Sequence, residues 1–286
     1  MRDEKLHLEP EMAARWKTLQ QKGVVIPEQP KVLLQIEKLT KSTGFQTRQL
    51  ATLIRQDPGL SARLLYIVNS PAYGLIEKIG NVENAIIILG ADRTLNLCRA
   101  VLLREAMNQA SPALEIFWKR SAIIAELTVA VAHRQRIGVS NDLAYLIGLF
   151  HACGVAVMAN ALPGYGDALA DETTWTHLEE HDRKFAADHV VVSYLVSRYW
   201  RLPEQIAESI LQQRGYSGCP PECESRDQCA TTNANAQCAG LVASLQLALL
   251  IYNRILLSSR TSEWEAAREA SLATLGMSEE QLARFA

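Results

Sequence analysis

The chain has 286 residues, of which 48% are hydrophobic and 21% are charged, the composition of an ordinary soluble globular protein. It is long enough for one large domain or two medium ones, each with a buried core. The 29 Lys and Arg residues nearly balance the 31 Asp and Glu residues, and the net charge of −2 excludes a global field that would attract DNA, RNA or anionic lipid.

Helical patterns fill the first half of the chain. Expected helices cover residues 9–21, 30–41, 48–56, 57–71, 82–89 and 92–107. Asn81 is expected to cap the fifth of these helices, and Gly90 is expected to end it. No segment in this half alternates between apolar and polar residues as a strand would. The run at residues 108–112 offers the clearest domain boundary.

The stretch 57–71 has the most sharply defined ends. Asp57 can cap the free N–H groups of the first turn, and Pro58 fits the first helical position. Pro71 stops the helix, because it disfavours the α conformation at Ser70. Asn69 is expected to hold the following loop by hydrogen bonds from its side chain to the backbone. The buried stripe of this helix is expected to be Leu60, Leu64, Ile67 and Val68.

The second half is also helical. Expected helices cover residues 114–136, 141–160, 185–200, 204–213 and 239–257, with capping boxes starting at Thr176, Ser262 and Ser278. The apolar run at residues 241–257 contains polar side chains and is short for a membrane span, so we expect a buried helix and no membrane contact. The charged N-terminus leads into no apolar signal region, so we expect a cytoplasmic location. The patterns together predict an all-α protein.

Four cysteines crowd one predicted loop, residues 216–238: Cys219, Cys223, Cys229 and Cys238. Four thiols are enough for a zinc site, but none of the spacings is the two-residue gap of zinc ribbons and fingers. Redox-sensitive or incidental thiols are the favoured interpretation, and zinc is the alternative. A disulfide in a cytoplasmic protein would be transient rather than structural. We expect no cofactor.

Three further side chains, His177, His181 and Asp182, could share a helical face. A metal pair is one interpretation of this spacing, and a solvated helix end is the favoured one. Asp188 precedes His189, and neighbouring helical side chains do not face each other. We therefore expect Asp188 to be a surface acid or an indirect support for the imidazole.

Several short motifs carry a family resemblance. They are Asp57-Pro58-Gly59-Leu60, Asn69-Ser70, Tyr73-Gly74, Leu89-Gly90, Gly148-Leu149-Phe150-His151, His189 and Trp200-Arg201-Leu202-Pro203. In these motifs, over roughly residues 25–260, the chain resembles HDOD domains, the bacterial signalling relatives of HD phosphohydrolases. The resemblance implies a two-lobed all-α fold. Residues 1–110 would form an N-terminal helical bundle that carries the signature from Asp57 to Gly90, and residues 111–286 an HD-like helical domain.

The HD fold builds its metal site from a His, a His-Asp doublet and a later Asp, which hold one or two divalent metals that activate water. The resemblance places Arg120 near the position of the first His, His151-Ala152 at the doublet and His189 at a later His. A His pair often found in the family reads Gln212-Gln213 here. The helix expected to supply the final Asp offers Asn253 instead.

Two imidazoles are too few for a hydrolytic centre, which keeps about three protein ligands and an open position. The guanidinium of Arg120 would also repel a cation in that pocket. The resemblance therefore implies a non-catalytic signal-transduction module that binds a protein or a small ligand. The expected partner, in trans, is a response regulator, a kinase or a protein of a cyclic-dinucleotide pathway. The alternative is a residual metal-dependent phosphohydrolase, or a binder of nucleotides or cyclic dinucleotides, that uses Arg120, His151 and His189. The net charge disfavours nucleic-acid binding.

Overall fold

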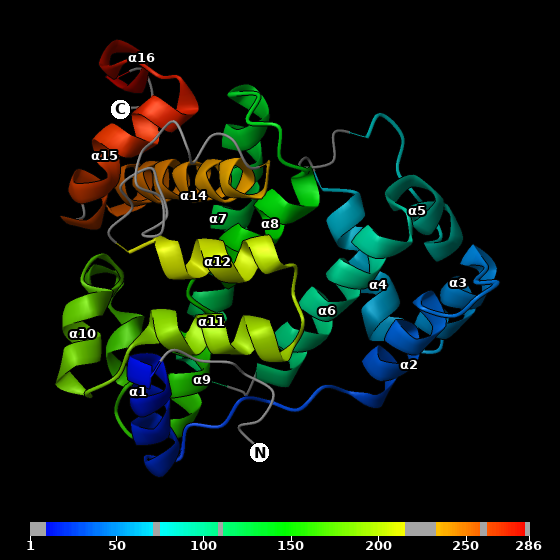
Figure 1. Cartoon of the computed structure of the whole chain (residues 1–286), viewed down its shortest axis with the longest axis horizontal. Helices are drawn as coiled ribbons and strands as arrows, with labels where there is room; N and C mark the ends of the chain where they lie inside the picture. The colour runs from blue at the N-terminus through cyan, green and yellow to red at the C-terminus, as the bar shows by residue number, and fades with distance from the viewer. Residues whose placement is uncertain (1–9, 71–74, 108–110, 215–232, 258–261, 284–286) are drawn as a thin grey trace. The chain divides into compact units, whose positions relative to one another are not determined.

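The computed structural model describes residues 10–70, 75–107, 111–214, 233–257 and 262–283 (Figure 1). Every regular element in these ranges is a helix, which confirms the predicted all-α class. Contacts divide the chain into a small unit, residues 27–108, and a large unit, residues 1–26 and 109–286.

Helix α1, Pro10–Gln21, and the link after it group with the large unit. These are the described residues 10–26, which the sequence analysis expects in the N-terminal bundle. The reason lies in this helix. Its Trp16 is buried, and its Arg15 forms an ion pair with Asp188 of the large unit, with 3.0 Å between Nη1 and Oδ2. These contacts involve residues far apart in the same chain, such as Arg15 and Asp188, so the local sequence pattern does not predict them.

The small unit packs its helices around α6. Its elements are α2 (Lys31–Thr40), α3 (Thr47–Arg55), α4 (Pro58–Val68), α5 (Val82–Leu89) and α6 (Ala91–Met107), and α2, α4 and α5 each contact α6. Glu37 of α2 and Arg99 of α6 form a buried ion pair, in which Oε1 accepts from Nε at 3.1 Å and from Nη2 at 2.9 Å. A buried charge is tolerated when it is paired in this way.

Helix α4 begins and packs as its sequence predicts. Asp57 has extended backbone angles, and its Oδ1 accepts a hydrogen bond from the backbone nitrogen of Leu60 at 3.0 Å. Pro58 occupies the first helical position, where its missing N–H costs nothing. All four residues of the expected stripe, Leu60, Leu64, Ile67 and Val68, are buried. The cap, the start and the core face of this helix are therefore confirmed.

The segment after α4 is held by Asn69. Its Nδ2 donates to the backbone oxygen of Ile79 at 2.9 Å, and its Oδ1 accepts from the backbone nitrogen of Ile79 at 2.7 Å. The predicted role of Asn69 is confirmed by this pair of bonds. Ser70 is buried, while Tyr73 and Gly74 lie outside the described residues. Gly90 ends α5 with a φ of 81°, a conformation that favours glycine.

The large unit contains the remaining helices. They are α1, α7 (Pro112–Arg134), α8 (Asn141–Phe150), α9 (Cys153–Ala161), η3 (Asp167–Ala170), η4 (Glu172–Thr176), α10 (Leu178–Lys184), α11 (His189–Tyr199), α12 (Glu204–Gln212), α14 (Asn233–Leu257), α15 (Ser262–Leu275) and α16 (Glu279–Ala283). Helix α14 contacts α7, α8, α12 and α15, and Figure 1 shows it running past α7 and α8.

Two segments of the large unit are long and apolar enough to cross a membrane by length and composition. They are residues 141–161 and 236–254, and 89% and 78% of their respective windows are buried inside the protein. Such burial is typical of core helices, and α7, α8 and α14 pack on one another here. The expectation of a buried helix at residues 241–257 is confirmed.

Three predicted boundaries in this unit are wrong. The expected helix 141–160 breaks at His151 and Ala152, where the backbone of Ala152 is not helical. The expected helix 185–200 begins only at residue 189, because Ala186 has a φ of 44° and the extended Asp188 caps α11. Thr176 donates to the backbone oxygen of Thr173 at 2.8 Å and starts no capping box, since α10 begins at residue 178.

Candidate functional site

A cavity of about 40 Å³ lies in the large unit, where the break between α8 and α9 meets α7, α11, α12 and α14. Four of the five residues that the sequence analysis assigns to the HD-like pocket line it: Arg120, His151, His189 and Gln213. Gln212, the last residue of α12, is not among the residues that line this cavity. Gln246 and Asn253 line the cavity from α14.

His151 lies at the break between α8 and α9. Its Nδ1 is 2.8 Å from the backbone oxygen of Gly148, which can only accept, so Nδ1 carries the hydrogen and Nε2 the lone pair. Burial, followed by the nearby charge of Arg120, lowers the pKa of His151 to about 3. The imidazole is therefore neutral at physiological pH. Gln213 donates to the backbone oxygen of His151 at 2.8 Å and ties α12 to this break.

Arg120 brings a permanent charge to the cavity. It projects from α7 and is 4% exposed. Its guanidinium carbon lies 5.0 Å from the ring centroid of Trp175 and 5.2 Å from that of Tyr252, both within the range of cation–π attraction. Because a guanidinium is not deprotonated in proteins, the charge persists at every working pH.

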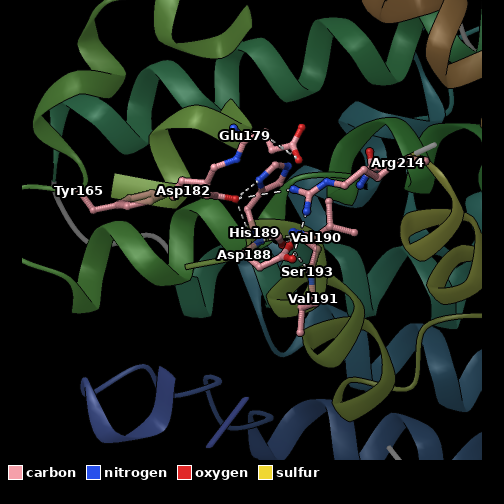
Figure 2. Close-up of polar contacts among 12 residues, drawn as sticks. Tyr165, Glu179, Asp182, Asp188, His189, Val190, Val191, Ser193 and Arg214 are labelled. Carbon is pink, nitrogen blue, oxygen red and sulfur yellow. Dashed lines mark hydrogen bonds and ion pairs between the residues drawn. The ribbon is translucent and has the colours of Figure 1, made fainter. Parts of the chain in front are cut away.

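His189, the first residue of α11, is held by Asp182 (Figure 2). Oδ2 of Asp182 lies 2.6 Å from the Nδ1 of His189 and accepts from its backbone nitrogen at 2.8 Å. Oδ1 accepts from the hydroxyl of Tyr165 at 2.6 Å. The ring of His189 is thus oriented by a carboxylate behind it, while the residue lines the cavity.

The carboxylate of Asp182 is buried, and its surroundings decide its charge. Burial alone would raise the pKa of Asp182, but the charge and hydrogen bonds of His189 and the hydrogen bond from Tyr165 hold it below its ordinary value. The predicted solvated helix end at His177, His181 and Asp182 is therefore wrong for two of its members, since His181 and Asp182 are buried. Nε2 of His181 lies 2.9 Å from the backbone oxygen of Tyr165.

Asp188 caps α11 and is more than a surface acid. Its Oδ1 accepts from the backbone nitrogens of Val190 and Val191 at 3.1 and 3.2 Å. Its Oδ2 lies 3.1 Å from Nη1 of Arg214, which lines the cavity and reaches toward Asp182 as well, at 3.8 Å (Figure 2). Asp188 therefore fixes the start of the helix that presents His189.

The described residues that line the cavity do not supply the ligand set that the resemblance implies for an HD metal centre. Within the described ranges, no group of three His, Cys, Asp or Glu side chains could hold an ion. His151 and His189 bring two imidazoles to the cavity, while Asp182 is engaged through both oxygens and does not line it. The charge of Arg120 further disfavours a cation at this place.

Of the four candidate cysteines, the structure describes only Cys238. Cys219, Cys223 and Cys229 fall outside the described residues. Cys238 is not in a loop as predicted, because α14 begins at residue 233 and includes it. It is a buried thiol, and its Sγ lies 3.8 Å from the backbone oxygen of Gln205.

The chain is similar in sequence to a known family and to one individual protein. The sequence matches the family model of the HDOD domain over residues 26–216. An uncharacterized protein of Treponema pallidum (strain Nichols) is 22% identical over 200 residues, which cover 69% of this chain and 39% of that protein. The chain therefore spans well under half the length of this relative.

Three solved structures share the fold. An HDOD domain protein of unknown function from Geobacter sulfurreducens is 20% identical, with a TM-score of 0.58 over 96% of each chain. A candidate signal transduction protein from Marinobacter aquaeolei VT8 is 19% identical, with a TM-score of 0.61 over 98% of this chain and 63% of that one. A candidate metal-dependent phosphohydrolase from Shewanella amazonensis SB2B is 15% identical, with a TM-score of 0.60 over 93% of this chain and 98% of that one.

Proposed function

This chain belongs to the HDOD family, and we propose that it is a non-catalytic signal-transduction module that works by binding a protein or a small ligand. One observation carries this proposal. The cavity that keeps His151 and His189 also holds the buried guanidinium of Arg120. A hydrolytic centre of the HD type would need a divalent cation where the protein supplies a fixed positive charge of its own.

The remaining ligands support the same interpretation. A catalytic metal site keeps about three protein ligands and an open position. His151 offers one lone pair at Nε2, and His189 offers a second group. By the resemblance, Ala152 stands where the doublet carboxylate would be, and the helix expected to supply the final Asp offers Asn253. Neither an alanine nor a neutral amide balances the charge of a divalent ion.

A module that catalyses no reaction can transmit a signal only by binding another molecule. We propose a cytoplasmic partner in trans, such as a response regulator, a kinase or a protein of a cyclic-dinucleotide pathway. Membership of the HDOD family and the likeness to a candidate signal transduction protein support this class of partner. Contact with membrane or nucleic acid is not part of the proposal, in keeping with the net charge of −2.

A residual phosphohydrolase is the second candidate. The pairing of His189 with Asp182 favours it, because a carboxylate that orients an imidazole is a common arrangement for a general base. The fold shared with a candidate metal-dependent phosphohydrolase points the same way.

Hydrolysis assays separate the two candidates. The intact chain, supplied with Mn²⁺ or Fe²⁺, is offered a panel of phosphomonoesters, phosphodiesters and cyclic dinucleotides, beside the variant His151→Ala. We expect no turnover by the intact chain above that of the variant. Turnover that needs both the metal and His151 would contradict the non-catalytic proposal and favour the second candidate.

A further inference from the structure

We infer that the cavity beside Arg120 is a receptor site for a small oxyanion that carries its own hydrogen, of the chemical class of hydrogen phosphate. The inference rests on the proposed function, because it names the ligand class of the same cavity. Three properties of the cavity support it: its charge, the hydrogen-bonding groups of its wall and its size.

The charge of the cavity favours an anion. The guanidinium carbon of Arg120 lies 5.0 Å and 5.2 Å from the ring centroids of Trp175 and Tyr252, and the side chain lines the cavity, where a planar guanidinium suits an oxyanion. Arg214 also lines the cavity, as a guanidinium that is 30% exposed and ion-paired with Asp188 at 3.1 Å, so Arg120 brings the main positive charge. None of the described lining residues is acidic.

The wall of the cavity also presents hydrogen-bond acceptors. His151 has its hydrogen on Nδ1, which leaves the lone pair of Nε2. Gln213 and Gln246 donate their amide groups to the backbone oxygens of His151 and Gln213, at 2.8 and 2.9 Å, and keep their side-chain oxygens as acceptors. Oδ1 of Asn253 is buried and has no hydrogen-bond partner among the described residues.

A guanidinium beside several acceptors selects for a particular kind of anion. Sulfate at neutral pH has lone pairs only, so its oxygens would face the acceptors of Asn253 and His151 without a hydrogen between them. Hydrogen phosphate has oxygens for the guanidinium and at least one O–H for an acceptor. An acceptor that stays unpaired in a buried site weakens binding, so the two tetrahedral anions should differ clearly.

The size of the cavity limits the ligand. Its volume of about 40 Å³ holds on the order of three water positions, since one water needs about 10–15 Å³ of such space. A small tetrahedral anion is compatible with that space, whereas a whole nucleotide or cyclic dinucleotide is too large for the cavity in this conformation. The inferred ligand is therefore an ion, or the terminal group of a molecule that remains outside.

Calorimetric titration tests the site with inorganic phosphate and with sulfate as probes, using the full chain in a chloride buffer of constant ionic strength. We expect phosphate to bind at least about tenfold more tightly than sulfate. Arg120→Met should abolish phosphate binding, and Arg214→Met, at the exposed rim, should weaken it. Arg183→Met, which removes an exposed arginine of the same unit, should leave it unchanged.

The outcomes separate this inference from the proposed function. Absence of phosphate binding up to about 10 mM, or equal binding of phosphate and sulfate, overturns the inference and leaves the non-catalytic proposal standing. Metal-dependent hydrolysis of any substrate in the panel overturns the proposed function, whether or not inorganic phosphate binds. If Arg120→Met fails to fold, as judged by circular dichroism, phosphate binding by Arg214→Met becomes the test. Unchanged phosphate binding in Arg214→Met would contradict the inferred site.

Discussion

Asp182 holds His189 by two hydrogen bonds, one to the ring and one to the backbone, with its Oδ2 2.6 Å from Nδ1 and 2.8 Å from the backbone nitrogen. The two residues lie in different helices, α10 and α11, so this contact fixes how one helix follows the other. It also sets the direction from which His189 reaches the cavity.

Loss of the carboxylate should therefore destabilise the large unit. We expect Asp182→Ala to lower the free energy of unfolding by about 3 kcal/mol, because it leaves the buried His189 and Tyr165 without their acceptor. Urea denaturation followed by circular dichroism measures the change. Asp167→Ala, at an exposed position of the same unit, serves as the control. Equal shifts for the two variants would mean that the contact contributes nothing.

The neutral state of His151 predicts a dependence of stability on pH. Burial and the charge of Arg120 lower its pKa from 6.5 to about 3 in the folded state, so between these values the unfolded chain binds the extra proton. Stability is then lost as pH falls below 6.5. From pH 7.5 to pH 5, the intact chain should lose about 2 kcal/mol more than His151→Gln. Denaturant titrations at both pH values test this, and parallel losses in the two proteins would refute it.

The sequence predicts the structure best where interactions between residues close together in the chain decide it. The cap at Asp57, the start at Pro58 and the bonds from Asn69 all depend on residues within about ten positions along the chain, and each is confirmed. The same holds for the capping box in which Ser278 and Gln281 exchange hydrogen bonds. In these cases the residue types alone specify the local geometry.

The candidate site was predicted only in part, for a physical reason. The motif positions predict that Arg120, His151, His189 and Gln213 share one pocket, but helical spacing gives no sign that Asp182 is buried. Asp182 and His189 are separated by a left-handed residue at position 186, which breaks the periodicity between them. The spacing of seven residues between Asp182 and His189 indicates a contact only when the left-handed residue at position 186 is known.

Close packing behind His189 depends on the absence of a side chain at Gly154. A Cβ there would meet the backbone oxygen of His189 and, at 2.8 Å, the backbone nitrogen of Ser193. Backbone atoms of α11 have little room to move, so Gly154→Ala should cost about 2 kcal/mol even though alanine favours a helix. Thermal unfolding measures it, with Gly80→Ala as the control, since a Cβ at Gly80 meets nothing within 4 Å. Matching melting temperatures for both variants would exclude the close contact.

The two hydrogen bonds between Asn69 and Ile79 can be removed one at a time. Asn69→Ala loses both bonds and should lower the free energy of unfolding by about 1–3 kcal/mol. Asn69→Asp should fall between that variant and the original, because an ionised carboxylate still accepts from the backbone nitrogen of Ile79 but has no hydrogen for its oxygen. Asn84→Ala, at an exposed position inside α5, should be neutral. Chemical denaturation gives the order of the four proteins. If Asn69→Ala unfolds at the same denaturant concentration as Asn84→Ala, these bonds do not stabilise the segment after α4.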